Sequence, residues 1–327
     1  MNLYPLKFNP ILRPMIWGGN DICSFKGITP EEVGIGESWE ISDVNGALSV
    51  VANGDLKGKT LAQVIENQES SILGAHVFEK FGSKFPLLIK FIDASNDLSI
   101  QVHPDDELAK KRHNSFGKTE MWYVINAREG AGLYSGFSQQ ITPVEYVSRV
   151  ENNTFMDVLK RYEVKEGDVF FLPAGRVHAI GSGLFIAEIQ QTSDVTYRIY
   201  DYNRRDKDGN RRELHTELAK DAIDYTLEDD YRTHYNSQQD VPVELVECKY
   251  FHTNLLEISK EYTKDVKSLD SFVIYICMEG EGLLVDSNDN NISFRKGESI
   301  LIPASIDGIK ISPKSNSKLL EVYIPKK

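Results

Sequence analysis

Cysteine is scarce in this sequence, with Cys23, Cys248 and Cys277 spread over 327 residues. The three are odd in number and too widely spaced for a paired metal motif or an evident disulfide framework. We therefore expect reduced thiols in the core.

Long apolar runs are also missing, since no segment approaches the roughly 20 residues that a membrane-spanning helix needs. The start of the chain, MNLYPLKFNPIL, lacks the basic residues, apolar run and small-residue cleavage site of a secretory signal. Hydrophobic residues make up 41% and charged residues 26%, as in a globular protein. We expect a soluble, cytoplasmic protein with no membrane partner.

Positive charge is in deficit, because the formal net charge is −12 at pH 7. Nucleic acids and anionic membranes need an exposed basic surface, so neither is expected as a partner. A small anionic substrate is still compatible with the sequence, provided that a few cations such as Lys90, Lys118 and Arg198 converge on it.

Short apolar segments between glycine and proline residues predict a mainly β protein with a few short helices. Thr60 is expected to cap a helix that runs to about Leu73, and Thr142 to cap another. A further short helix is predicted at 154–162. Residues 121–137 have the pattern of a β-hairpin.

The second half of the chain contains a faint copy of the first. Residues 295–309, RKGESILIPASIDGI, align with KEGDVFFLPAGRVHAI at 165–180, which predicts duplicated small β-barrels. A polar, highly charged segment at about 203–241 links the two halves. We predict a catalytic domain over 1–240 and a degenerate domain over 241–327.

The segment SIQVHPDD begins as a strand with one polar face. Ser99, Gln101 and His103 point one way, and the aliphatic residues that alternate with them point the other. Such a strand packs one face and offers the other to a site.

Two further segments bring ligands to the same place. Lys118 and Glu120 alternate along a second strand, and His178 follows the turn of GDVFFLPAGRVHAIG. Two imidazoles, one carboxylate and the amide oxygen of Gln101 form a mixed N/O set that suits zinc, with manganese, iron or cobalt as alternatives. One such histidine alone is more often structural. The joint pattern favours a shared metal site, because packing alone would place aliphatic residues there.

Other candidates carry a structural alternative. Lys90 interrupts an apolar strand and needs either an anionic partner or a route to the surface. Trp39 and Glu40 are expected to line a pocket, with Trp39 equally suited to the core. Asp194 and Arg198 share a strand face and act together, unless they form a surface ion pair.

The GD-x-x-x-x-PAG-x-x-H element, with His and Glu on inward faces, resembles the cupin superfamily, whose fold is a jelly roll. SIQVHPDD, KTEMWYV, PAGRVHAIG and TSDVTYRIYDY, together with the N-terminal IWGG and GESWEIS, resemble the short bacterial branch of the type I mannose-6-phosphate isomerases. The resemblance implies two cupin-type jelly-roll barrels. The chain lacks room for the full helical domain of longer members.

The resemblance also implies site residues. It assigns one zinc ion to Gln101, His103, Glu120 and His178. Catalytic roles fall to Arg198, Lys118 and Asp194, and contacts with the substrate phosphate to Ser99 and Lys90. In the second half, Gly308 stands at the place of His178, so no second metal is expected.

The implied reaction interconverts mannose 6-phosphate and fructose 6-phosphate through an enediol, which requires a base, charge stabilisation and a phosphate anchor. The base stays open among a metal-bound water, Lys118, Asp194 and a residue near Glu40. A metal-dependent cupin dioxygenase and a non-enzymatic sugar-binding cupin are the alternatives. The sequence leaves the oligomeric state open.

Overall fold

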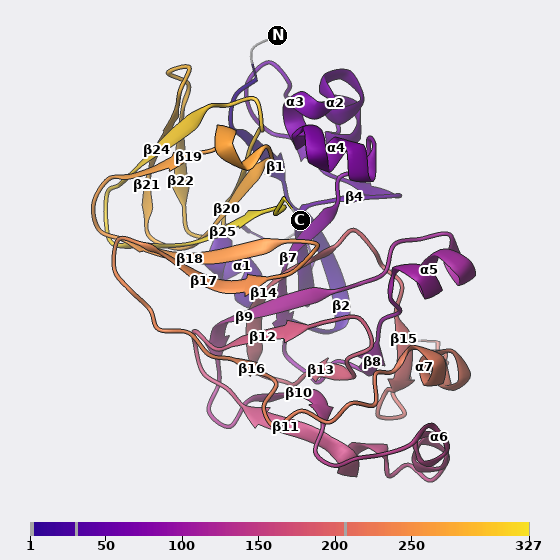
Figure 1. Ribbon diagram of the computed structural model, residues 1–327. Helices are drawn as coiled ribbons and strands as arrows, with labels where there is room; N and C mark the ends of the chain where they lie inside the picture. The colour runs from indigo at the N-terminus through magenta and orange to yellow at the C-terminus, as the bar shows by residue number, and fades with distance from the viewer. Residues whose placement is uncertain (1–2, 30–31, 206–207, 327) are drawn as a thin grey trace.

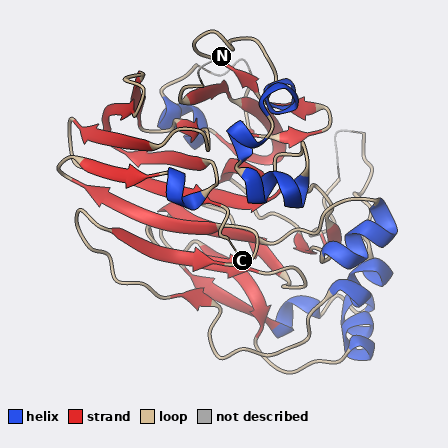
Figure 2. Cartoon of the chain, turned by 45° about the horizontal axis from the view of Figure 1, so that its top comes forward, coloured by secondary structure: helices blue, strands red, loops and turns tan. Residues whose placement is uncertain are grey.

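Antiparallel strands dominate the computed structural model, which describes residues 3–29, 32–205 and 208–326. The prediction of a mainly β protein with short helices is confirmed. Most helices gather along one side of the molecule, and the stacked sheets form most of the rest (Figures 1 and 2). No helix within the described ranges has the length and apolarity to cross a bilayer.

Two sheets form the half that carries the candidate site. Sheet I has seven strands, in the order β16 (Arg232–Thr233), β12 (Val169–Leu172), β9 (Glu120–Ala127), β14 (Leu184–Gln191), β7 (Leu87–Ala94), β2 (Ile11–Gly19) and β3 (Ile35–Ile41). Sheet II has five, in the order β11 (Leu159–Glu163), β10 (Gly132–Phe137), β13 (His178–Ile180), β8 (Ile100–Val102) and β15 (Tyr197–Tyr200).

Two more sheets form the other half. Sheet III runs β17 (Pro242–Glu247), β18 (His252–Ile258), β25 (Ser317–Tyr323), β20 (Val273–Glu279), β23 (Ser299–Ile302), β1 (Leu6–Asn9) and β6 (Val50–Val51). Sheet IV runs β19 (Tyr262–Asp265), β24 (Gly308–Pro313), β21 (Glu281–Asp286) and β22 (Asn291–Arg295). A two-stranded ribbon pairs β4 (Asp43–Val44) with β5 (Ala47–Leu48).

Short helices connect these strands. They are α1 (Asp21–Lys26), α2 (Leu61–Gln68), α3 (Ser70–Leu73), α4 (Ala75–Phe81), α5 (Asp106–His113), α6 (Pro143–Glu151) and α7 (Thr216–Ala222), with 3₁₀ turns η1 (Phe155–Val158) and η2 (Lys267–Leu269). Thr60 and Thr142 cap α2 and α6 through their side chains, as predicted. The helix predicted to reach Leu73 is broken at Glu69, whose φ is +43°.

Strand alternation explains the layering. On β9, Met121 and Tyr123 belong to the core between sheets I and III, while Trp122 and Val124 belong to the core between sheets I and II. A third core lies between sheets III and IV. The layers therefore follow the order II, I, III, IV, and the face of sheet I that carries Glu120 is turned toward sheet II.

Two sequence predictions are wrong here. The hairpin at 121–137 does not form, because β9 pairs within sheet I and β10 within sheet II, so the turn at Glu129 and Gly130 crosses between sheets. The helix predicted at 154–162 is the short turn η1 followed by β11. At 121–137 the two strands were predicted correctly and only their pairing was wrong, whereas at 154–162 strand pairing with β10 overrides the expected helix.

The internal copy is visible in the topology. β9, β10, β12, β13 and β14 are joined in the same manner as β20, β21, β23, β24 and β25, with each turn crossing between two sheets. Asp265 pairs with Gly308 at the place where Gln101 pairs with His178. Because β1 and β6 lie in sheet III, the predicted boundary near residue 240 does not separate the sheets, and the two-domain division stays a prediction.

Candidate metal centre

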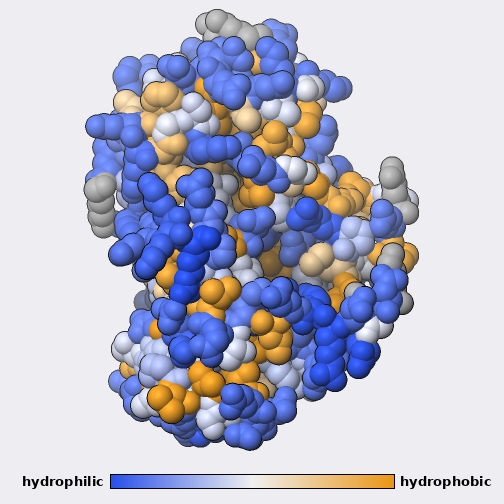
Figure 3. All heavy atoms as spheres, turned by 90° about the vertical axis from the view of Figure 1, so that its right-hand side faces the viewer, coloured by the Kyte–Doolittle hydropathy of each residue, from blue (hydrophilic) through white to orange (hydrophobic). Residues whose placement is uncertain are grey.

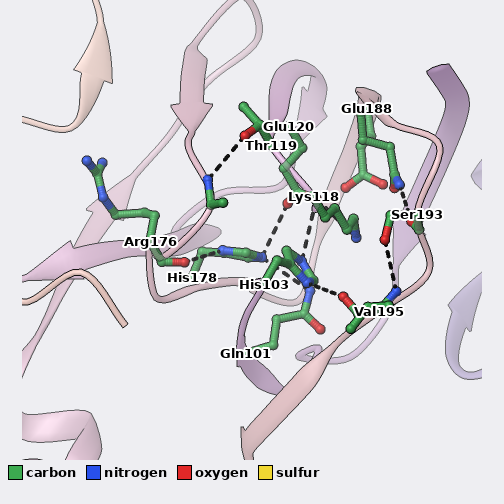
Figure 4. Close-up of polar contacts among 12 residues, drawn as sticks. Gln101, His103, Lys118, Thr119, Glu120, Arg176, His178, Glu188, Ser193 and Val195 are labelled. Atoms are coloured by element: carbon green, nitrogen blue, oxygen red, sulfur yellow. Dashed lines mark hydrogen bonds and ion pairs between the residues drawn. The ribbon is translucent and has the colours of Figure 1, made fainter. Parts of the chain in front are cut away.

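Three buried side chains converge between sheets I and II. Glu120 opens β9, His178 opens β13 and His103 directly follows β8. Their ligand atoms lie within 4.8 Å of one another, a grouping able to hold a metal ion. All three are at most 1% exposed. Figure 4 shows the two imidazoles and the carboxylate turned toward a common point.

The distances define a tight cluster. Glu120 Oε2 is 3.6 Å from His103 Nε2, and Glu120 Oε1 is 3.2 Å from His178 Nε2. The amide of Gln101 lies 3.3 Å from His178 Nε2, and a half-turn about its last bond places its oxygen toward the same point.

Backbone carbonyls fix the imidazoles. His103 Nδ1 lies 2.9 Å from the carbonyl of Val195, and His178 Nδ1 lies 2.8 Å from that of Arg176. An Nδ1–H that donates to a carbonyl leaves the lone pair on Nε2, which in both residues faces Glu120. This is the tautomer that a metal ligand needs.

The electrostatics agree. Burial, and then nearby Lys118, hold the pKa of His103 well below its usual value, and burial lowers the pKa of His178 to about 3. Neutral imidazoles make no ion pair with Glu120. His103 Nε2 and Glu120 Oε1 are buried without a hydrogen-bond partner, and Glu120 Oε2 has only the ammonium of Lys118 beside it, at 3.1 Å. These unsatisfied atoms are the donor set that a divalent cation would accept, so the residues fit a metal.

Burial, and then the charge of Glu188, raise the pKa of Glu120 to about 7. Lys118 Nζ lies 3.1 Å from Glu120 Oε2 and favours its ionised form. Lys118 therefore favours the ionised form of Glu120, which is the form that a metal ligand needs, while burial and Glu188 oppose it.

A pocket of about 680 Å³ opens above this cluster. Its lining includes seven of the predicted site residues: Trp39, Lys90, Ser99, Gln101, Lys118, Asp194 and Arg198. The face of the molecule from which α5 and α7 project is mostly hydrophilic and is hollowed near its middle (Figure 3).

Glu40 is placed away from the pocket. Trp39 and Glu40 are neighbours in β3, so their side chains point to opposite faces of sheet I and cannot both line one pocket. Both carboxylate oxygens of Glu40 accept from the ammonium of Lys26, at 2.8 and 2.7 Å. The expectation that Glu40 lines the pocket is not supported by its position.

The Glu40–Lys26 pair is 5% and 8% exposed, so we predict a structural role. Glu40→Gln should lower the free energy of unfolding by about 3–5 kcal/mol, because it leaves a buried ammonium unpaired. Chemical denaturation checks this, and the double variant with Lys26→Met should recover much of the loss. A Glu40→Gln protein that folds with wild-type stability but loses its activity would restore Glu40 to the site.

Lys90 reaches an anionic partner inside the protein. Its ammonium lies 3.1 Å from Glu188 Oε1, while Trp122 Nε1 donates to Glu188 Oε2 at 2.8 Å. Burial opposes ionisation of Glu188, but Lys90 and Lys118 outweigh it and hold its pKa at about 2. Sequence reasoning missed Glu188, although a lone acid in the apolar run LFIAEIQQ is the same signal that identified Lys90.

Arg198 and Asp194 both line the pocket, yet no ion pair joins them among the contacts of the described residues. Asp194 precedes β15 and is exposed. Arg198 donates through Nη1 to the carbonyl of Glu213 at 3.0 Å, and its buried Nε has no partner. Burial, and then Arg212, lower the pKa of Arg198. The surface ion pair, which was the structural alternative, does not form between these two described residues, and the guanidinium keeps hydrogen-bonding capacity.

The antiparallel sheets have the arrangement of a cupin-type fold, and the buried His–Glu–His cluster between two of them could hold a metal ion. Family models for the type I phosphomannose isomerase catalytic domain and the mannose-6-phosphate isomerase cupin domain match residues 6–124 and 243–324. The chain is 36% identical to mannose-6-phosphate isomerase ManA of Bacillus subtilis, over 95% of this chain and 96% of that protein. It belongs to the type I mannose-6-phosphate isomerase family.

Other relatives agree. A mannose-6-phosphate isomerase of Streptococcus mutans is 33% identical, covering 92% of this chain and 93% of that one. The crystal structure of the Bacillus subtilis mannose 6-phosphate isomerase superposes with a TM-score of 0.87 at 32% identity, covering 97% of this chain and 99% of that chain. The short bacterial form inferred from the motifs is confirmed.

Proposed function

We propose that this protein interconverts mannose 6-phosphate and fructose 6-phosphate in a zinc-dependent manner. The observation that carries the proposal is the buried cluster of His103, Glu120 and His178 beneath a pocket lined by cationic side chains. The relatives that cover nearly the whole chain carry the name of this activity.

Gln101, His103, Glu120 and His178 would hold the metal. A zinc ion, when bound there, supplies a Lewis acid that polarises and orients sugar oxygens. The residues around it do the rest. Sheets I and II bury the cluster, so water is kept from the metal side of the sugar.

The reaction moves a proton between C2 and C1 of the open-chain sugar. Asp194 and Glu188 are pocket-lining carboxyl groups able to take that proton, and Glu188 is ionised at neutral pH. Lys118 can act as the base only after its ammonium, which is paired with Glu120, has given up a proton. Glu40 leaves the set of candidate bases, because Lys26 occupies its carboxylate outside the pocket. Arg198 stabilises the negative charge that develops on the enediolate oxygens.

An NMR assay of purified protein with mannose 6-phosphate tests the proposal directly. The signals of fructose 6-phosphate should grow until the two sugars reach equilibrium. A metal-loaded, folded protein that produces no fructose 6-phosphate would contradict it. Oxygen uptake with bound iron would instead point to a dioxygenase.

We predict one tightly bound zinc ion per chain, since Asp265 and Gly308 replace the ligands in the second half. Elemental analysis of the purified protein measures the stoichiometry. Chelation should abolish isomerisation and zinc should restore it. Two tightly bound ions per chain would show that the second half also holds a metal.

A further inference from the structure

Most cationic side chains that line the pocket are already held by an acid. Lys90 pairs with Glu188 at 3.1 Å, and Lys118 pairs with Glu120 at 3.1 Å. Their charges are largely balanced before any substrate arrives, and both ammonium groups are buried. A phosphate dianion would have to compete with these carboxylates.

Arg212 is also engaged. It binds Asp201 in a bidentate manner, with Nε 2.7 Å from Oδ2 and Nη2 2.5 Å from Oδ1. Two guanidinium groups facing the pocket have no carboxylate partner within the described ranges, namely Arg13 and Arg198. Arg198 is assigned to the reacting carbons, so Arg13 is the cation left for another part of the substrate.

Arg13 lies over an aromatic platform, the ring of Trp39. Its guanidinium carbon is 4.1 Å from the centre of that ring. A cation–π contact holds the guanidinium at the ring and uses none of its N–H donors, so they can still bind a tetrahedral anion.

The platform itself is held firmly. Trp39 is 4% exposed, and its Nε1 donates to Glu37 Oε2 at 2.6 Å. Trp39 packs with Ala47 and Leu88 in a small core of its own. A rigid ring fixes the direction of the Arg13 fork, which lowers the entropy that anion binding would cost.

We infer that Arg13, which lies over the ring of Trp39, binds the phosphate group of the substrate. The sugar would then extend from β2 toward sheet II, which places C1 and C2 at Lys118 and the metal centre. This inference rests on the proposed function for the identity of the sugar. It reassigns the phosphate from Lys90, whose ammonium is occupied by Glu188, and leaves the hydroxyl of Ser99 at the pocket wall.

Arg13→Gln on the zinc-loaded protein tests it, because glutamine keeps part of the stem but removes the charged fork. We expect KM for mannose 6-phosphate to rise about 10- to 100-fold, while kcat changes by less than about threefold, since the anchor lies away from the reacting carbons. Inorganic phosphate, titrated by calorimetry, should bind correspondingly more weakly. Arg13→Lys should have a KM and a phosphate affinity between those of the wild type and Arg13→Gln, because lysine keeps the charge but not the planar fork.

Arg232→Gln is the matched control. Arg232 also lies over aromatic rings, those of Tyr162 and Phe170, but it does not line the pocket. Its KM and phosphate affinity should equal those of the wild type. Unchanged phosphate affinity in Arg13→Gln, or a loss confined to kcat, would overturn the inference. Phosphate binding that depends on Arg13 in a protein without isomerase activity would support the anchor and reject the proposed function.

Discussion

Arg198→Ala should reduce turnover by about 10²-fold or more, which corresponds to roughly 3 kcal/mol of transition-state stabilisation. Negative charge grows on the enediolate as the proton leaves, and a fixed guanidinium stabilises that charge without reorganising. The structure provides such a group, since Arg198 is held through Nη1 by the carbonyl of Glu213 and has no carboxylate partner among the described residues.

The variant should keep its zinc and melt within a few degrees of the wild type, because no ion pair is lost with the side chain. Arg198→Lys should rescue turnover poorly, since one ammonium cannot reproduce the planar fork. Steady-state kinetics, zinc content and thermal melting together check the assignment. A variant that unfolds readily yet isomerises normally when folded would make Arg198 a structural residue.

Alternation along single strands carried most of what the sequence predicted. Gln101, His103, Lys118 and Glu120 were placed correctly on the faces that meet at the pocket and the cluster, because a period of two is a local property of the chain. The same rule, applied strictly, separates Trp39 from Glu40. The expectation that both side chains line one pocket does not follow from that rule.

Local sequence patterns could not identify which residues lie opposite each other on neighbouring strands. Glu188 meets Lys90 because β14 and β7 pair in the register that sets these two residues opposite each other, and Arg13 meets Trp39 because β2 and β3 pair. Register depends on turns and on packing along the whole sheet, so a single sequence does not reveal it. The lone Glu188 in an apolar run nevertheless signals a buried partner.

The sequence also did not show which sheet each strand joins. The turn at Glu129 and Gly130 has the sequence of a hairpin, but its two strands part into sheets I and II. MEGEGLLVD in the repeated half makes the same crossing, between β20 and β21. The repeat in the sequence therefore indicates that the two halves share a topology, but not which sheet each strand joins.

Glu120→Gln should weaken zinc binding by at least about 10²-fold and lower turnover accordingly. Loss of a residue that merely supports a ligand already costs 10- to 100-fold in metal affinity, so loss of a direct ligand should cost no less. The amide removes the carboxylate of the cluster and leaves Lys118 Nζ, 3.1 Å away, without its counter-charge. Both changes raise the positive potential that the incoming cation meets.

Folding should survive this change, because Glu188 remains as an acid close to Lys118 and because burial and Glu188 already disfavour the charge of Glu120. Glu321→Gln is the matched control: Glu321 is also fully buried, but in sheet III, where it binds Lys264 at 2.7 Å and Tyr275 at 2.6 Å. That variant should lose stability and keep its zinc, while Glu120→Gln should keep its fold and lose zinc on dialysis. If Glu120→Gln retained full zinc content and the wild-type rate, the carboxylate would be a packing residue and the metal would have to be held without it.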